Sequence, residues 1–167
     1  DLLTLDQLSI PGNLTIYATM NSADQGVFPL DTAFRRRWDQ EYLPLYGPHT
    51  PEGDVIVVHP SDGEVRISWD KFARGLNAFL VDEFDAAEDR LLGQWFVRPH
   101  ELGCDVPDKI LLYLWDDLLR HEDRFILFNK SAGRTYGDLN DTRLNKGAVF
   151  SDRFLSALID VPDDTGH

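Results

Sequence analysis

Sulfur-containing residues are almost absent from this sequence, which has one cysteine, Cys104, and one methionine, Met20. A single cysteine cannot form an intramolecular disulfide, and it excludes metal sites that need several thiolates. The five histidines are scattered, without the short His–His or His–carboxylate spacings that are typical of zinc ligands. We therefore expect no metal ligands among these residues.

Long apolar runs are also missing. No segment approaches the roughly 18 uninterrupted apolar residues of a membrane helix, and the first residues lack the basic-then-apolar pattern of a secretion signal. We therefore expect a soluble, cytoplasmic protein with no membrane contact. The chain begins at Asp1 rather than at a methionine, and for this reason we expect it to be a fragment of a longer protein.

Positive charge is scarce, because 16 Lys and Arg face 29 Asp and Glu, for a net charge of −13. Nucleic-acid binding depends on cations that displace counterions from phosphates, so we expect these residues not to bind DNA directly. An acidic surface that keeps the protein soluble is the simpler explanation. With 43% hydrophobic and 11% aromatic residues, the 167-residue chain can bury a core of ordinary size.

The N-terminal third has the pattern of an α/β segment. The run Leu14 to Thr19 is short and rich in β-branched residues, which predicts a buried strand. Apolar residues at helical spacing from Leu30 to Trp38 predict a short helix with Arg35, Arg36 and Arg37 at its C-terminal end. The run from Gln40 to Leu45 is compatible with another strand.

A β-hairpin and amphipathic helices are predicted for the rest. Two extended runs, Val55 to His59 and Glu64 to Ser68, flank the turn sequence Pro60-Ser61-Asp62-Gly63. Beyond them, apolar stripes at helical spacing predict three helical segments. These stripes contain Trp69, Phe72, Leu76, Phe79 and Leu80, then Ile110, Leu111, Leu114, Trp115 and Leu118 behind Pro107, and finally residues 150–159.

Two polar groups near the first predicted strand suit phosphate chemistry. Asn21 follows the strand, where an open α/β sheet presents side chains to a ligand, and its amide can contact a γ-phosphate or hold a water. Arginine matches phosphate oxygens with a rigid fork and can be supplied by a neighbouring subunit. The alternatives are a turn-forming asparagine and three cations that complement a helix C-terminus, and spacing alone leaves them open.

This stretch resembles the sensor-1 strand and following helix of the McrB branch of AAA+ proteins, where Thr-Met-Asn precedes a short acidic segment and an Asp-x-Ala-x-Arg-Arg-Arg-aromatic helix. Residues 69–97 are similar to the lid helices of a McrB-like subfamily, and residues 109–119 resemble its next helix. The likeness covers most of residues 10–120. The landmarks are Thr19-Met20-Asn21, Asp24, Asp31, Ala33, Arg35-Arg36-Arg37-Trp38, Leu76-Asn77, Glu88 to Gly93 and Trp95-Phe96-Val97.

The resemblance implies an α/β plus α fold, with residues 1–50 as the C-terminal part of an AAA+ core, 51–68 as a hairpin insertion and 69–167 as a helical lid subdomain. It implies that Asn21 is sensor 1 and that Asp24 belongs to the adjoining signature loop. One or more of Arg35, Arg36 and Arg37 would act as an arginine finger or contact nucleotide. Arg90 is the candidate sensor-2 cation, and a surface salt bridge is its competing explanation.

The phosphate loop G-x-x-x-x-G-K-[ST] and the acidic Mg²⁺-binding strand are absent from these residues. We therefore expect this chain alone to bind nucleotide weakly and to hydrolyse none. GTP or ATP with Mg²⁺ would be bound in the intact protein mainly by other segments. Family members with GTP preference usually carry Arg directly after the signature Asp, where this chain has Gln25, and this departure leaves base preference and turnover open.

The resemblance implies a GTP- or ATP-hydrolysing motor subunit of a modification-dependent DNA restriction system. Such a subunit would form a homo-oligomeric ring, work with a McrC-like nuclease subunit, and reach DNA through other parts of the complex. Two alternatives stay open. One is an AAA+ ATPase that remodels protein complexes, and the other is a non-enzymatic helical interaction module.

Overall fold

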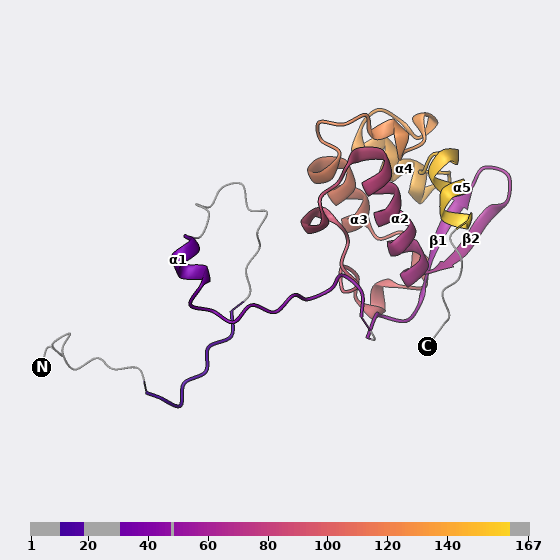
Figure 1. Cartoon of the computed structure of the whole chain (residues 1–167). Coiled ribbons are helices and arrows are strands. Elements are labelled where there is room, and N and C mark those ends of the chain that lie inside the picture. Colours follow the sequence, from indigo (N-terminus) through magenta and orange to yellow (C-terminus); the bar gives the residue numbers. More distant parts are fainter. Residues whose placement is uncertain (1–10, 19–30, 48, 161–167) are drawn as a thin grey trace, which may run out of the picture. The chain divides into compact units, whose positions relative to one another are not determined.

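The computed structural model describes residues 11–18, 31–47 and 49–160 of the chain (Figure 1). Contacts divide the chain into two units, Asp1–Trp38 and Asp39–His167, and each is described by itself. The first contains the helix α1 (Thr32–Arg35). The second contains β1 (Asp54–His59), β2 (Gly63–Ser68), α2 (Trp69–Phe84), η2 (Glu88–Arg90), η3 (Pro99–Glu101), β3 (Cys104–Asp105), α3 (Asp108–Leu112), η4 (Tyr113–Leu118), η5 (Arg124–Ile126), η6 (Lys130–Ala132), α4 (Tyr136–Leu144) and α5 (Asp152–Asp160).

The predicted hairpin is confirmed. Strands β1 and β2 pair antiparallel, and Gly63, at φ 75°, closes the turn opposite His59. A positive φ is a conformation that glycine adopts without steric cost, which explains the residue at this position. Strand β3 adds two parallel pairs on the other side of β1, so the sheet order is β2-β1-β3. Val55, Val57 and Ile67 are buried and place one face of the sheet in the core.

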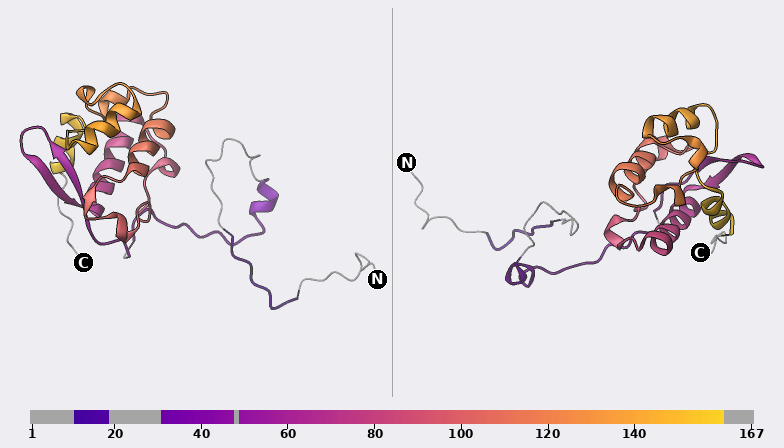
Figure 2. Two further views of the ribbon diagram at one scale, coloured as in Figure 1. Left: turned by 180° about the vertical axis from the view of Figure 1, so that it is seen from behind. Right: turned by 90° about the horizontal axis from the view of Figure 1, so that it is seen from above.

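Helix α2 forms where the apolar stripe predicts it. The Ser68 side chain accepts a hydrogen bond from the Lys71 N–H (3.3 Å) and caps the first turn. The helix ends at Phe84, and Asp85 after it has a left-handed conformation with φ 51°. All five stripe residues, Trp69, Phe72, Leu76, Phe79 and Leu80, are buried. Figure 2 shows α2 beside the hairpin and α5, and the same neighbours are in contact.

The two later helical segments are confirmed in position. Pro107 directly precedes α3, and helical structure continues through Leu118, but its second half, η4, is a π-helix. Helix α5 begins at Asp152 within the predicted segment. Helix α4 was not predicted, because its nine residues bury only Leu139 and have no continuous apolar stripe. Its N-terminus is held by a capping box between Thr135 and Asp138.

One core joins the hairpin and the helices. Aromatic rings form its centre, with Phe72 6.0 Å from Phe150 and 6.2 Å from Phe154 between ring centroids. Phe79 and Phe154 are 5.2 Å apart, so α2 and α5 meet through this cluster. Residues 51–68 therefore share their core with residues 69 onward. By contacts, residues 39–50 fall in the same unit as the hairpin and the helices.

The strand predicted from Leu14 to Thr19 is wrong over residues 14–18, and the one predicted over 40–45 is also wrong. Residues 14–18 have no strand hydrogen bonds and are exposed; the Tyr17 side chain is 92% accessible. Residues 40–45 are irregular. A strand is stabilised by neighbouring strands, and among the described residues neither segment has such a neighbour. β-Branched composition therefore favours extended backbone here without forming a sheet.

Candidate functional site

Arg35, Arg36 and Arg37, which we call the arginine triplet, lie at the end of α1 and in the turn after it. The Asp31 carboxylate accepts a hydrogen bond from the Ala33 N–H (3.2 Å), and the Asp31 carbonyl accepts from the N–H groups of Phe34 and Arg35. Arg35 ends the helix, which is therefore shorter than the predicted segment from Leu30 to Trp38. Two further hydrogen bonds, Arg37 N–H to Phe34 O (3.1 Å) and Trp38 N–H to Arg35 O (3.2 Å), continue the turn.

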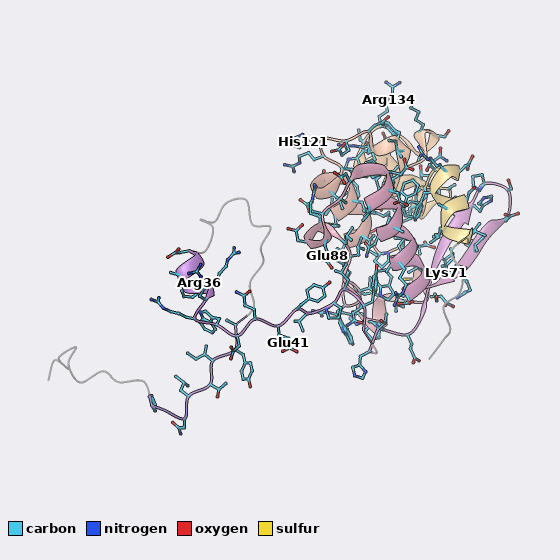
Figure 3. The ribbon with its side chains drawn as sticks, viewed as in Figure 1. Arg36, Glu41, Lys71, Glu88, His121 and Arg134 are labelled. Carbon is cyan, nitrogen blue, oxygen red and sulfur yellow. The ribbon has the colours of Figure 1, made fainter. Side chains whose placement is uncertain are left out.

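All three arginine side chains are exposed. Phe34 and Trp38 are four residues apart in the sequence. Their ring centroids are 5.8 Å apart, so the two rings pack together beside this turn. Figure 3 labels Arg36, in the turn directly after α1, and Glu41, farther along the chain. A four-residue helix has little macrodipole, which weakens the explanation that the triplet merely complements a helix terminus. The exposed guanidinium groups are chemically suited to phosphate oxygens.

Asn21 and Asp24 lie outside the described residues. Their proposed meeting with the arginine triplet at a nucleotide therefore stays a prediction.

Arg90 lies at the end of η2 and caps a helix. One of its terminal nitrogens donates to the carbonyl oxygens of Asp117 (3.2 Å) and Leu118 (2.8 Å), at the C-terminal end of η4. The Tyr113 hydroxyl in turn donates to the Arg90 carbonyl (2.7 Å), and burial raises the pKa of this hydroxyl. A cation that satisfies the last carbonyls of a helix is a common stabilising device. This contact, rather than a salt bridge, is what the structure shows for Arg90, and its sensor-2 role stays a prediction.

A second set of polar contacts was missed by the sequence analysis. Residues 39–50, which we call the junction segment, begin one residue after the arginine triplet and are hydrogen-bonded to later parts of the second unit. The Tyr42 hydroxyl donates to the Glu88 carboxylate, which raises the pKa of Tyr42. Glu88 is labelled on the folded unit in Figure 3. The Gln94 N–H donates to the Leu45 carbonyl (2.9 Å).

Tyr46 and Gly47 of the junction segment also contact later parts of the second unit. The Asn77 amide donates to the Tyr46 hydroxyl, and the Arg74 guanidinium lies 4.2 Å from the centroid of the Tyr46 ring. Burial raises the pKa of Tyr46, against the opposing effects of the Asn77 hydrogen bond and the Arg74 charge. The Gln94 side-chain oxygen accepts from the Gly47 N–H (2.8 Å). One feature of the sequence could have indicated this site: Asn77 is a polar residue beside the apolar stripe of a predicted helix.

Within residues 11–18, 31–47 and 49–160, no group of three or more His, Cys, Asp or Glu side chains is arranged to hold a metal ion. Helices in the same part of the chain are all too short or too polar to cross a membrane.

Comparison with known proteins finds similarity to a component of a restriction enzyme. No family model and no solved structure matches it. Among curated proteins, it is similar to component YdiS of the type II restriction enzyme BsuMI from Bacillus subtilis (strain 168), with 37% identity over 131 residues. The match takes in 76% of this chain and 37% of the relative. The chain therefore spans little more than a third of that protein's length.

Proposed function

We propose that this chain serves in a restriction system, as part of a GTP- or ATP-hydrolysing subunit of the McrB-like AAA+ type. The observation that carries the restriction role is the 37% identity with a restriction-enzyme component over most of the chain. The nucleotide-hydrolysing role is supported by the resemblance of residues 10–120 to McrB-like proteins. The exposed arginine triplet is compatible with it.

In this proposal, the arginine triplet acts on phosphoryl transfer. A water attacks the γ-phosphorus, the bond from that phosphorus to the β–γ bridging oxygen breaks, and the nucleoside diphosphate leaves with the bonding electrons. The transferred group becomes inorganic phosphate, and the proton that the water loses passes to solvent. Negative charge on the transferring group and the leaving oxygen is stabilised by a guanidinium, which keeps its own proton throughout. Asn21 would align the water, and Arg90 would contact nucleotide from the helical unit.

Mg²⁺ is usually held by one or two carboxylates together with the phosphates of the nucleotide. We expect its ligands and the phosphate loop in other segments of the intact protein. This chain alone should therefore bind GTP and ATP weakly. Isothermal titration of the chain with each nucleotide tests this, and micromolar affinity would contradict it.

The arginine role is tested in the intact protein by Arg36→Ala. We expect turnover to fall about 10³-fold, the scale at which an arginine finger contributes to phosphoryl transfer. Arg134→Ala, which removes an exposed arginine from the loop before α4, serves as the matched control and should hydrolyse nucleotide at the wild-type rate. Arg35→Ala and Arg37→Ala, measured beside it, identify which arginine acts. Wild-type rates in all three variants would exclude the arginine finger.

Action across a subunit boundary is tested by mixing two inactive variants. A subunit with Arg36→Ala keeps Asn21, and a subunit with Asn21→Ala keeps its arginine triplet. If the proteins form a ring and the arginine acts on a neighbour's nucleotide, mixed assemblies regain part of the activity. If each subunit uses its own arginine, the mixture stays inactive.

The restriction role is tested in cells. Transformation with modified and unmodified plasmids compares cells that carry the intact gene and its operon partner with cells that lack either one. We expect loss of modified plasmid only when both are present, because a McrC-like nuclease subunit would do the cutting. Equal transformation in all three strains would contradict the proposal.

A non-enzymatic interaction module is the second candidate. The supporting observation is the hydrophobic core within residues 39–167, which a module that binds partners without catalysis also needs. Nucleotide hydrolysis by the intact wild-type protein would exclude this candidate.

A further inference from the structure

Strand β2 lies at an edge of the sheet. The order β2-β1-β3 leaves its outer side without a neighbouring strand in the part of the chain that the structure describes. In Figure 1 and Figure 2 the hairpin extends past the helices of its own unit, so this edge lies at the periphery of that unit. An open edge presents backbone N–H and C=O groups that can pair with a further strand.

Two hydrogen bonds show which residues of β2 turn their backbone groups outward. Alternate residues of an antiparallel pair bond to the partner strand. The Gly103 N–H donates to the Asp54 carbonyl (2.7 Å), so Asp54 faces β3, whereas the Trp69 N–H donates to the Gly53 carbonyl (2.8 Å) on the side of β2. Since Asp54 lies opposite Ser68 in the register, the same alternation gives outward N–H and C=O groups to Glu64 and Arg66.

This alternation restricts how a second copy of β2 can pair with the first. An antiparallel copy forms a hydrogen-bonded ladder only where outward-facing residues lie opposite each other. With Val65 on a two-fold axis, Glu64 of each copy lies opposite Arg66 of the other. With Arg66 on the axis, two Arg66 side chains lie opposite each other, and like charges at that position are unfavourable. The register around Val65 is therefore the favoured one.

The charges on this edge are available for such a contact. The Glu64 and Arg66 side chains are exposed, on the face of β2 opposite the buried Ile67. Arg66 forms no ion pair within the described residues. Lys146 lies 3.4 Å from Glu64 but only 2.8 Å from Asp105, so it neutralises Glu64 only in part. Edge charges of a single sign would repel a second copy, whereas these opposite charges attract one.

We propose that β2 is a self-pairing edge, through which two copies of this chain join their sheets with Val65 on the two-fold axis. Backbone hydrogen bonds and a Glu64–Arg66 ion pair on each side of the axis hold the copies together. The half-buried Val65 side chain meets its equivalent on the other face. A contact made by one six-residue strand is small, so the chain forms a weak dimer.

Sedimentation equilibrium of the 167-residue chain tests self-pairing. We expect a reversible dimer with a dissociation constant on the order of 100 µM. Arg66→Glu places like charges opposite each other on both sides of the axis and should raise this constant at least about ten-fold. Arg134→Glu makes the same change of charge at an exposed arginine in the loop before α4. It is the matched control and should leave the dissociation constant unchanged.

Exchanging the two charges provides the rescue. The double variant Glu64→Arg with Arg66→Glu keeps the net charge and restores opposite charges in the same register. Its dissociation constant should return to within about three-fold of the wild-type value, and circular dichroism verifies that each variant is folded. A double variant that dimerises as weakly as Arg66→Glu would overturn the register. A wild-type chain that stays monomeric up to about 1 mM would overturn self-pairing altogether.

Amide hydrogen exchange identifies the edge that is used. In the monomer, the outward N–H groups of Glu64 and Arg66 face solvent, whereas those of Val65 and Ile67 face β1. We expect exchange at Glu64 and Arg66 to slow at least about three-fold when the concentration is raised to favour the dimer. A dimer that leaves both amides unprotected uses another surface and contradicts the proposal. Protection that requires an added McrC-like subunit, and not a higher concentration of the chain, would assign the edge to that partner and exclude self-pairing.

Discussion

Residues 14–18 and strand β1 were both predicted to be strands, but only β1 is one. Both contain β-branched and aliphatic residues in a short run. Val55 and Val57 are buried in a sheet and against helices, whereas Leu14 and Ile16 are more than half exposed. The difference lies in the neighbouring strands, because β1 pairs with β2 on one side and with β3 on the other. Extended segments gain stability from pairing and burial rather than from their own propensity.

The same contrast separates the two aromatic groups of the molecule. Phe34 and Trp38 contact each other beside the arginine triplet, and Phe34 is 43% exposed. Phe72 is fully buried among Trp69, Phe150 and Phe154. Stability should therefore reside in residues 39–167, whereas the arginine triplet lies on an exposed turn. Substitutions in each unit test this difference in stability.

Phe72→Ala should have the largest effect on stability. It removes a ring from the centre of the core and should lower the free energy of unfolding by about 3–5 kcal/mol. Phe34→Ala, the matched control in the first unit, should change it by less than about 0.5 kcal/mol. Chemical denaturation followed by circular dichroism measures both. Equal losses would show that the two units share one core.

Asn77→Ala should come next. It leaves the Leu92 N–H and carbonyl without their side-chain partner, at a cost of about 1–3 kcal/mol in the free energy of unfolding. Asn145→Ala removes an exposed amide that bonds the Asp141 carbonyl (2.8 Å), and it should cost little because water replaces the contact. The same denaturation curves compare the two. A neutral Asn77→Ala would contradict the importance of this buried amide.

Arg90→Ala should have a smaller effect, about 0.5–1.5 kcal/mol, because two helix-end carbonyls lose a donor and become solvated. Arg134→Ala, at an exposed arginine in the loop before α4, is the control and should be neutral. Thermal unfolding of both variants measures the difference. If Arg90→Ala is as stable as wild type while nucleotide affinity of the intact protein falls, Arg90 serves nucleotide rather than the helix.

Asp138 should show the smallest effect, as a pH dependence. Hydrogen bonds from the Thr135 side chain, then from the N–H groups of Arg134 and Thr135, lower the pKa of Asp138 below its ordinary value of 3.8. A lowered folded-state pKa gives stability that is present above the unfolded value and is lost as pH falls through the folded one. Unfolding curves below about pH 4 should therefore differ between wild type and Asp138→Asn. Parallel pH profiles would contradict this.

Several elements could be predicted from the sequence because their signals are local. The hairpin follows from a turn with glycine between two extended runs, and α2 follows from its apolar stripe behind Ser68. Helix α4 could not be predicted from periodicity, because polar capping and one buried leucine hold it. The roles of Asn21, Asp24 and the arginine triplet came from family resemblance, and their meeting at a nucleotide depends on residues outside those described.

The sequence by itself determined where the hairpin and the main helices form, because turn chemistry and hydrophobic periodicity act over a few residues. It also placed three arginines in a row at the end of a short helix. Only the tertiary structure decided that residues 14–18 form no strand and that Asn77 meets both Tyr46 and Leu92. Strand pairing and buried hydrogen bonds require groups from distant positions, and no local pattern specifies which of them come together.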